Sequence, residues 1–159
     1  MSEITSQYLT FRLAQEQYAL EVSQVQEVLE MQDITHIPGM PGYMRGVINI
    51  RGRVVPVVDL RAKLGLPARE NTEEAAIIVA EISEGESHLT LGCLADSVQE
   101  VTNMDQAALE PPPKMGTSIQ SVWIKAIGKK EDGFVILLDM ERIFNFDELA
   151  QVYKEEKEA

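Results

Sequence analysis

Apolar and polar residues alternate along most of the chain in short runs that are separated by turn residues. Alternation with a period of two is typical of half-buried β-strands. The runs pair across short turns into four expected hairpins. Their strands are QYLTFRLA (7–14), QYALEV (17–22), GVINI (46–50), RVVPVVDL (53–60), AAIIVAEI (75–82), HLTLGCLA (88–95), SVWIKAIG (121–128) and GFVILLDM (133–140). Pro56 has no backbone N–H, which indicates that its strand lies at a sheet edge or contains a bulge.

The tetrapeptide VQEV occurs twice, at 25–28 and at 98–101. Around the first copy the apolar spacing fits both a helix and a strand. We favour a helical turn over 22–25 that leads into a strand. Helical periodicity is otherwise confined to short pieces and to the C-terminal run 147–159, which opens with acidic residues as helix N-termini prefer.

Three blocks recur in the same order in the two halves of the chain. The matched blocks are 17–31 with 90–104 at an offset of 73, 45–49 with 124–128 at an offset of 79, and 55–64 with 135–144 at an offset of 80. A repeat of about 70–80 residues in two copies is too long and too few for a solenoid, which stacks several short units. The pattern therefore indicates an internal duplication of a small domain.

About ten strands, grouped five and five by the repeat, predict an all-β fold of two five-stranded SH3-like β-barrels. Short connecting helices and a C-terminal helix complete it. We expect one domain over 6–150, with a first barrel over 15–72, a second over 73–145, and a helix and tail over 146–159. The N-terminal strand 6–14 is compatible with membership of the second barrel. Small barrels bury little surface alone, so two fused copies should share a core and form a groove between them.

Composition fits a folded protein, because 45% of the 159 residues are apolar and 25% are charged. The single cysteine, Cys93, permits no intrachain disulfide and lies in an apolar strand, where we expect an inert buried thiol. The N-terminus lacks the features of a secretory signal, and no apolar run approaches the length of a membrane span. We expect a cytoplasmic protein without direct membrane insertion.

The net charge of −12 disfavours nucleic acid and anionic lipid as partners. The charge is uneven, however, because window 45–69 contains one acid, Asp59, among six basic residues. These are Arg45, Arg51, Arg53, Arg61, Lys63 and Arg69. The window is either an ordinary solvated surface or a basic dock for an acidic protein partner.

Catalytic and metal chemistry find little support in the residues. His36 and His88 have no cysteine, histidine or acid at the spacing of metal ligands. The chain also has no phosphate-binding glycine loop and no nucleophile elbow. We expect no catalytic residue, no metal and no cofactor. A small-molecule carrier or an enzyme that uses the expected groove stays open as an alternative.

Five segments together resemble one family. They are YALEVSQVQEVLEM (18–31), YMRGVINIRGRVVPVVDLRAKLGL (43–66), DSVQEV (96–101), LEPPPKMG (109–116) and WIKAIGKKEDGFVILLDMERIF (123–144). The chain resembles CheW, the coupling proteins of bacterial chemotaxis, over about 6–150. It departs from the family pattern at Glu30–Met31, where many relatives have Arg–Gly. It also departs at Lys114–Met115, where relatives often have an acid and a large apolar residue.

The resemblance implies a non-catalytic adaptor with two SH3-like barrels. Such an adaptor joins the signalling tips of chemoreceptors (methyl-accepting chemotaxis proteins) to the regulatory domain of a CheA-type histidine kinase. The resemblance also implies rings with other CheW copies, and a cytoplasmic location at receptor arrays through these partners. The alternative is a coupling protein of a non-chemotaxis receptor–kinase pathway, such as surface motility.

The resemblance also suggests which residues couple. Candidate receptor-binding residues are Val25, Glu27, Val28, Asn49, Arg51, Val98, Glu100 and Val101. Candidate kinase-binding residues are Arg45, Glu110 and Met115.

Physical reasons accompany some of these assignments. Arg51 lies at a tight turn and can offer a planar guanidinium to a carboxylate. The family implies that Glu27 lies beside it, and we expect Asn49 to shape the turn through its side chain. Purely structural alternatives stay open. Arg51 is then an ordinary turn arginine, Val25, Val28, Val98 and Val101 are core residues, and segment 109–116 is a rigid connector.

Overall fold

The computed structural model describes residues 5–67, 73–111, 123–130 and 133–144. The strands are β1 (Thr5–Leu13), β2 (Glu16–Glu21), β3 (Val25–Glu30), β4 (Met44–Ile50), β5 (Arg53–Asp59), β6 (Ala76–Glu84), β7 (Ser87–Ala95), β8 (Ser97–Asp105), β9 (Ile124–Lys130) and β10 (Gly133–Leu138). The short helices are η1 (Val22–Gln24), α1 (Leu60–Lys63), η2 (Gln106–Ala108) and α2 (Met140–Ile143). The helical turn before β3 confirms the expectation for the first VQEV copy. The C-terminal helix expected over 147–159 lies outside the described residues.

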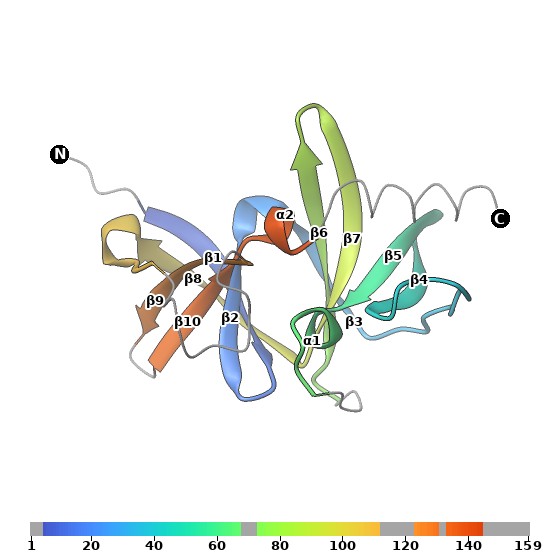
Figure 1. The fold of residues 1–159 in the computed structure, drawn as a ribbon, viewed down its shortest axis with the longest axis horizontal. Coiled ribbons are helices and arrows are strands. Elements are labelled where there is room, and N and C mark those ends of the chain that lie inside the picture. Colours follow the sequence, from blue (N-terminus) through green and yellow to red (C-terminus); the bar gives the residue numbers. More distant parts are fainter. Residues whose placement is uncertain (1–4, 68–72, 112–122, 131–132, 145–159) are drawn as a thin grey trace.

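The strands form two five-stranded sheets that lie side by side (Figure 1). One sheet has the order β8-β1-β2-β10-β9 and the other has the order β3-β6-β7-β5-β4. Backbone bridges then curl each sheet toward closure, since Thr35 pairs with Val47 and Glu110 pairs with Ile127. The grouping of five and five strands, expected from the repeat, is confirmed.

The sheets do not follow the expected halves 15–72 and 73–145, which corrects those boundaries. Strand β2 precedes β3 in the chain but pairs with β1 and β10, and β6 and β7 pair with β3 and β5. Repeat one runs from β1 to α1, and repeat two runs from β6 to α2. The β1–β2 hairpin of repeat one therefore belongs to the sheet of β8, β9 and β10, and the β6–β7 hairpin of repeat two belongs to the sheet of β3, β4 and β5. The expected boundary failed because sequence similarity reports the duplication and says nothing about which strands pair.

The register of the middle repeat block also differs from the sequence alignment. In the β4–β5 pair Val47 lies opposite Pro56, and in the β9–β10 pair Ile127 lies opposite Ile136. The offset is thus 80 in this block rather than 79, so that segment 45–49 corresponds to 125–129. The correction matters because a shift of one residue moves every side chain to the other face of the sheet.

Pro56 lies in an interior strand, so the expectation of a sheet edge there is wrong, whereas a bulge does occur close by, in the partner strand β4 between Met44 and Gly46. β5 runs between β4 and β7 in the sheet. The N–H and C=O of Val47, opposite Pro56, both bond to Thr35 at 2.9 Å and therefore point away from β5. On the other side the ladder to β7 begins only at Val57. No neighbouring strand needs the N–H that proline lacks.

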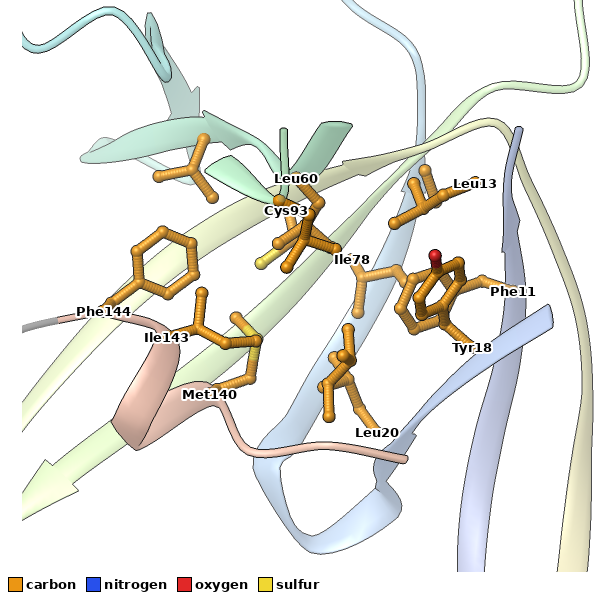
Figure 2. Packing of buried hydrophobic residues seen from close by; sticks show 14 of the residues in the cluster. Phe11, Leu13, Tyr18, Leu20, Leu60, Ile78, Cys93, Met140, Ile143 and Phe144 are labelled. Carbon is orange, nitrogen blue, oxygen red and sulfur yellow. The ribbon is translucent and has the colours of Figure 1, made fainter. Parts of the chain in front are cut away.

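The largest apolar cluster lies between the two sheets and contains residues of both repeats. Figure 2 shows Phe11, Leu13, Tyr18 and Leu20 of the β1–β2 hairpin facing Leu60, Ile78, Cys93, Met140, Ile143 and Phe144. Two smaller clusters fill the individual barrels. Within β6, Ile77 belongs to the cluster inside the barrel formed by β3 to β7, and Ile78 belongs to the cluster shared by the two sheets. The exchanged hairpins are thus buried on both faces, which explains the continuous apolar run Ala76–Ala80 at the start of β6.

One carboxylate joins three separate parts of the chain. Asp96, between β7 and β8, accepts hydrogen bonds from Arg61 Nε at 2.9 Å and from Arg61 Nη2 at 2.5 Å. It also accepts the backbone N–H of Ala14 at 2.7 Å, where the turn of the β1–β2 hairpin has a positive φ of 57°. The Arg61 side chain is only 7% exposed. This ion pair therefore fixes helix α1 of repeat one against both exchanged hairpins.

Leu20→Ala should lower the free energy of unfolding by about 2–5 kcal/mol, because it opens a cavity in the shared cluster. Far-UV circular dichroism and the fluorescence of Trp123 should still change together during urea unfolding, since neither barrel is complete without the other repeat. Val54→Ala, at a position that is 45% exposed, is the control and should change stability by less than about 0.5 kcal/mol. Two separate transitions would show that the barrels fold independently.

Arg61→Leu should destabilise the fold by about 2–3 kcal/mol, because Asp96 keeps its charge in a partly buried site without its cation. Arg45→Leu is the matched control. Arg45 is 42% exposed and lies 3.5 Å from Asp59, so its loss should cost less than about 1 kcal/mol. Urea denaturation of the two variants measures the difference, and equal effects would contradict the structural role of Arg61.

Candidate functional site

The turn between β4 and β5 presents Arg51 to solvent. Arg51 and Gly52 have φ values of 49° and 84°, the left-handed conformation of both central residues that suits a tight hairpin. Asn49 Oδ1 accepts the backbone N–H of Gly52 at 2.9 Å, which confirms that Asn49 shapes this turn. A bulky residue with positive φ is unfavourable. A strained backbone at an arginine whose side chain is exposed is consistent with a use for that side chain.

Arg51 forms a two-pronged ion pair with Glu27 of β3, as the family resemblance implied. Arg51 Nη2 lies 2.5 Å from Glu27 Oε2, and Nη1 lies 3.3 Å from Oε1. The hydrogen bond and charge of Arg51 hold the pKa of Glu27 below its usual value. The Arg51 side chain remains 75% exposed. The pair thus connects the edge strand β3 to the β4–β5 turn and leaves a cation accessible to a partner.

Glu100, the acid of the second VQEV copy, pairs with Lys130 at the end of β9, with Nζ 2.7 Å from Oε1. At the offset of 80 between the repeats, Lys130 corresponds to Ile50, the residue before Arg51. A lysine ammonium lacks the planar fork of arginine, so this second pair is a single contact. Sequence reasoning missed Lys130, although the repeated glutamate indicated that a base should lie at the same end of the second barrel.

The two VQEV segments meet at a groove of about 510 Å³. Val28 of β3 and Val98 of β8 line it from the two sheets, and Ala75 and Ala76 line it at the start of β6. Val25 and Val98 also pack partly against the shared cluster. The structure therefore brings together Val28 and Val98, two residues of the predicted receptor-binding set, at one groove. It also identifies Val25 as partly a core residue, in line with the purely structural alternative.

Exposed large apolar side chains occur at equivalent positions of the two repeats. Among the described residues they are Val28 and Val54 in one repeat and Val101 and Phe134 in the other. Val28 corresponds to Val101 at the offset of 73, and Val54 corresponds to Phe134 at the offset of 80. Sequence reasoning included Val28 and Val101 but missed Val54 and Phe134, because both continue the alternation of strands that look buried.

The basic window 45–69 does not form one cationic surface. Arg45, Arg51 and Arg61 each pair with a carboxylate of the chain itself. Lys63 Nζ lies 4.4 Å from the ring centroid of Tyr43 and 5.7 Å from that of Trp123, a cation–π arrangement. Arg69 lies outside the described residues. Most of the described window is therefore better explained as structural ion pairs than as a basic dock.

The candidate kinase-binding residues lie on different sheets. Arg45 is exposed on β4. Glu110 pairs through its backbone with Ile127 of β9, and its carboxylate lies 3.8 Å from Lys129. Met115 lies outside the described residues. The structure therefore does not join Arg45 and Glu110 in one site.

Reactive groups are few in the described part of the chain. Cys93 is fully buried, and burial raises the pKa of its thiol well above the usual range. His88 Nδ1 lies 2.7 Å from the Ser83 hydroxyl and 3.2 Å from Glu81. Within the described ranges no three His, Cys, Asp or Glu residues gather as metal ligands. The helices in those ranges are also too short or too polar to cross a membrane.

Comparisons with known proteins agree with the fold. Residues 7–148 match the family model of the CheW-like domain. The chain is 31% identical over 137 residues to the chemotaxis protein CheW of Bacillus subtilis, covering 86% of this chain and 85% of that protein. It is 26% identical over 149 residues to the CheW of Klebsiella aerogenes, covering 94% and 87% of the two chains. The crystal structure of the scaffolding protein TtCheW from Thermoanaerobacter tengcongensis superposes with a TM-score of 0.81, at 31% identity and 92% coverage of both chains.

The Glu27 carboxyl should titrate below its usual pKa of 4.5, because Arg51 stabilises the charged form. Stability from the pair is then fully present above the pKa of the unfolded chain and is lost as the pH falls through the lower folded value. In Arg51→Asn, which tolerates the positive φ, the Glu27 pKa should return toward 4.5. Carboxyl-carbon NMR titration measures both values. An unchanged pKa in the variant would show that the ion pair does not persist in solution.

Proposed function

Because the chain belongs to the CheW-like domain family, we propose that it is an adaptor that couples chemoreceptor signalling tips to a CheA-type histidine kinase. The observation that carries the proposal is the groove lined by both VQEV segments, which lies on the same strand β3 as the Glu27–Arg51 pair. A groove with apolar residues from both sheets, on a strand that also holds an exposed ion pair, is suited to binding a protein segment. On this proposal the protein has no catalytic activity of its own.

The receptor tip docks in the groove and along the adjoining strand edges. The residues assigned to this contact are Val25, Glu27, Val28, Asn49, Arg51, Val98, Glu100 and Val101. The exposed valines supply apolar area that a partner can cover, which is the main source of affinity. Arg51 lies at the β4–β5 turn and not among the residues that line the groove. It supplies direction there, since its planar guanidinium can share a second carboxylate with a part of the partner outside the groove. Asn49 acts indirectly by holding the turn that presents Arg51.

We assign Arg45, Glu110 and Met115 to contacts with the kinase regulatory domain. Arg45 and Glu110 lie on different sheets and neither lines the groove, so contacts at these residues leave the groove free for the receptor. Further CheW copies can extend the assembly into rings. Each contact can then be small, because several weak contacts within one array act together. The protein itself stays cytoplasmic and reaches the membrane only through the receptors.

A receptor–kinase pathway other than chemotaxis, such as surface motility, would use the same contacts. The two versions differ in the identity of the receptor and not in the mechanism. Receptor state would in either case change kinase output through the geometry of the shared contacts.

A sedimentation assay with receptor signalling fragments and a CheA-type kinase tests the proposal. The wild-type protein should join the pellet and change kinase autophosphorylation. Arg51→Asp should reduce both effects at least tenfold and leave the midpoint of urea unfolding close to that of the wild type, because the side chain is exposed. Arg142→Asp, a similarly exposed arginine on α2, is the matched control and should behave as the wild type.

Two outcomes would contradict parts of this account. If the wild-type protein neither sediments nor affects the kinase, the assigned partners are wrong. If Arg51→Asp lowers the unfolding midpoint markedly, Arg51 is a structural residue, and the loss of coupling then says nothing about a docking role.

A further inference from the structure

The groove between the VQEV segments has an apolar floor and an acidic rim. Val28, Val98 and the two alanines at 75 and 76 contribute apolar surface. Glu30, at the end of β3, and Glu73 and Glu74, just before β6, line the same groove and are exposed. Glu30–Met31 is the segment that departs from the family pattern, and both of its residues line this groove.

No basic residue offsets these acids within the part of the chain that the structure describes. The lining residues of the groove include no lysine, arginine or histidine. Arg12, opposite Ser97 and thus close to Val98, donates to the backbone carbonyl of Gln15, and Arg51 is engaged with Glu27. The whole chain adds a net charge of −12. Like charges around a cleft with apolar walls focus the field into it and attract cations.

We infer that this groove selects a partner segment whose apolar side chains are flanked by lysine or arginine. The inference rests on the proposed function and deepens it, because it states the chemistry of the receptor segment that this adaptor accepts. Apolar contact with the floor supplies affinity, and the acidic rim rejects segments flanked by acids. The volume of the groove lies within the range of specific binding pockets and suits a few side chains of one short segment.

Two fluorescein-labelled synthetic helical peptides with the same apolar face test the selectivity directly. One carries lysine and arginine at the flanking positions, and the other carries glutamate there. Fluorescence anisotropy should give at least tenfold tighter binding of the basic peptide in 50 mM NaCl, and the difference should shrink in 300 mM NaCl, because salt screens exposed charges. Equal affinity for the two peptides, binding of neither, or a preference for the acidic peptide would overturn the inference.

A pair of double variants with the same net charge separates the rim from the overall charge. Glu30→Lys with Glu74→Lys reverses the rim and should abolish or invert the preference between the peptides. Glu86→Lys with Glu141→Lys changes two exposed acids outside the groove, at the β6–β7 turn and on α2, and should keep the preference. If both double variants lose it equally, the net charge and not the rim is responsible, and the inference fails.

The same variants in the receptor sedimentation assay distinguish this inference from the proposed function. If only the rim variant, Glu30→Lys with Glu74→Lys, fails to sediment with receptor fragments, both the inference and the proposed function are supported. Equal sedimentation of the rim variant and the wild type overturns the inference and leaves the adaptor function intact. If the affinity for the basic peptide depends on the rim acids but no receptor fragment sediments with the protein, the selectivity of the groove is supported and the proposed receptor partner is wrong.

Discussion

Reciprocal exchange of two hairpins is the constraint on which the rest of the structure depends. Each repeat supplies three strands to its own sheet and two central strands to the other, so neither repeat can close a barrel alone. The exchanged hairpins have one face inside a barrel and the other in the shared cluster. Arg61 and Asp96 then fix the point where the chain crosses between sheets. Stability and relative orientation of the barrels therefore come from the same contacts.

The candidate docking surface is a consequence of this arrangement. In both sheets the VQEV strand lies at an edge beside an exchanged hairpin, because β3 pairs with β6 and β8 pairs with β1. The equivalent valines Val25 and Val98 both reach the seam between the barrels, and the groove opens where β3, β6 and β8 meet. Because residues of both repeats line the groove, a partner in the groove contacts both repeats at once. Such a contact is sensitive to any change in barrel orientation, as expected of an adaptor that transmits a signal.

The sequence predicted the strands, the duplication and the five-and-five grouping, because alternation and turn residues are local signals. The pair Glu27–Arg51 followed from the family resemblance, and the role of Asn49 followed from turn chemistry. The exchange of hairpins and the salt bridge between Arg61 and Asp96 depend on contacts between distant segments, about which local patterns carry no information. The offset of 80 in the middle block depends on the register within the β4–β5 and β9–β10 pairs, which sequence similarity over five residues did not fix. Lys130 was not predicted either, because its contact with Glu100 depends on the register of β9.

The most direct test of the central claim, that the groove between the exchanged repeats is the docking site, is hydrogen exchange of the full-length protein with and without a receptor signalling fragment. The account predicts slower amide exchange in segments 25–31, 73–77 and 96–101, which line or adjoin the groove, with little change in β9 and β10. Protection confined to β9 and β10, with unchanged exchange in the two VQEV segments, would contradict it.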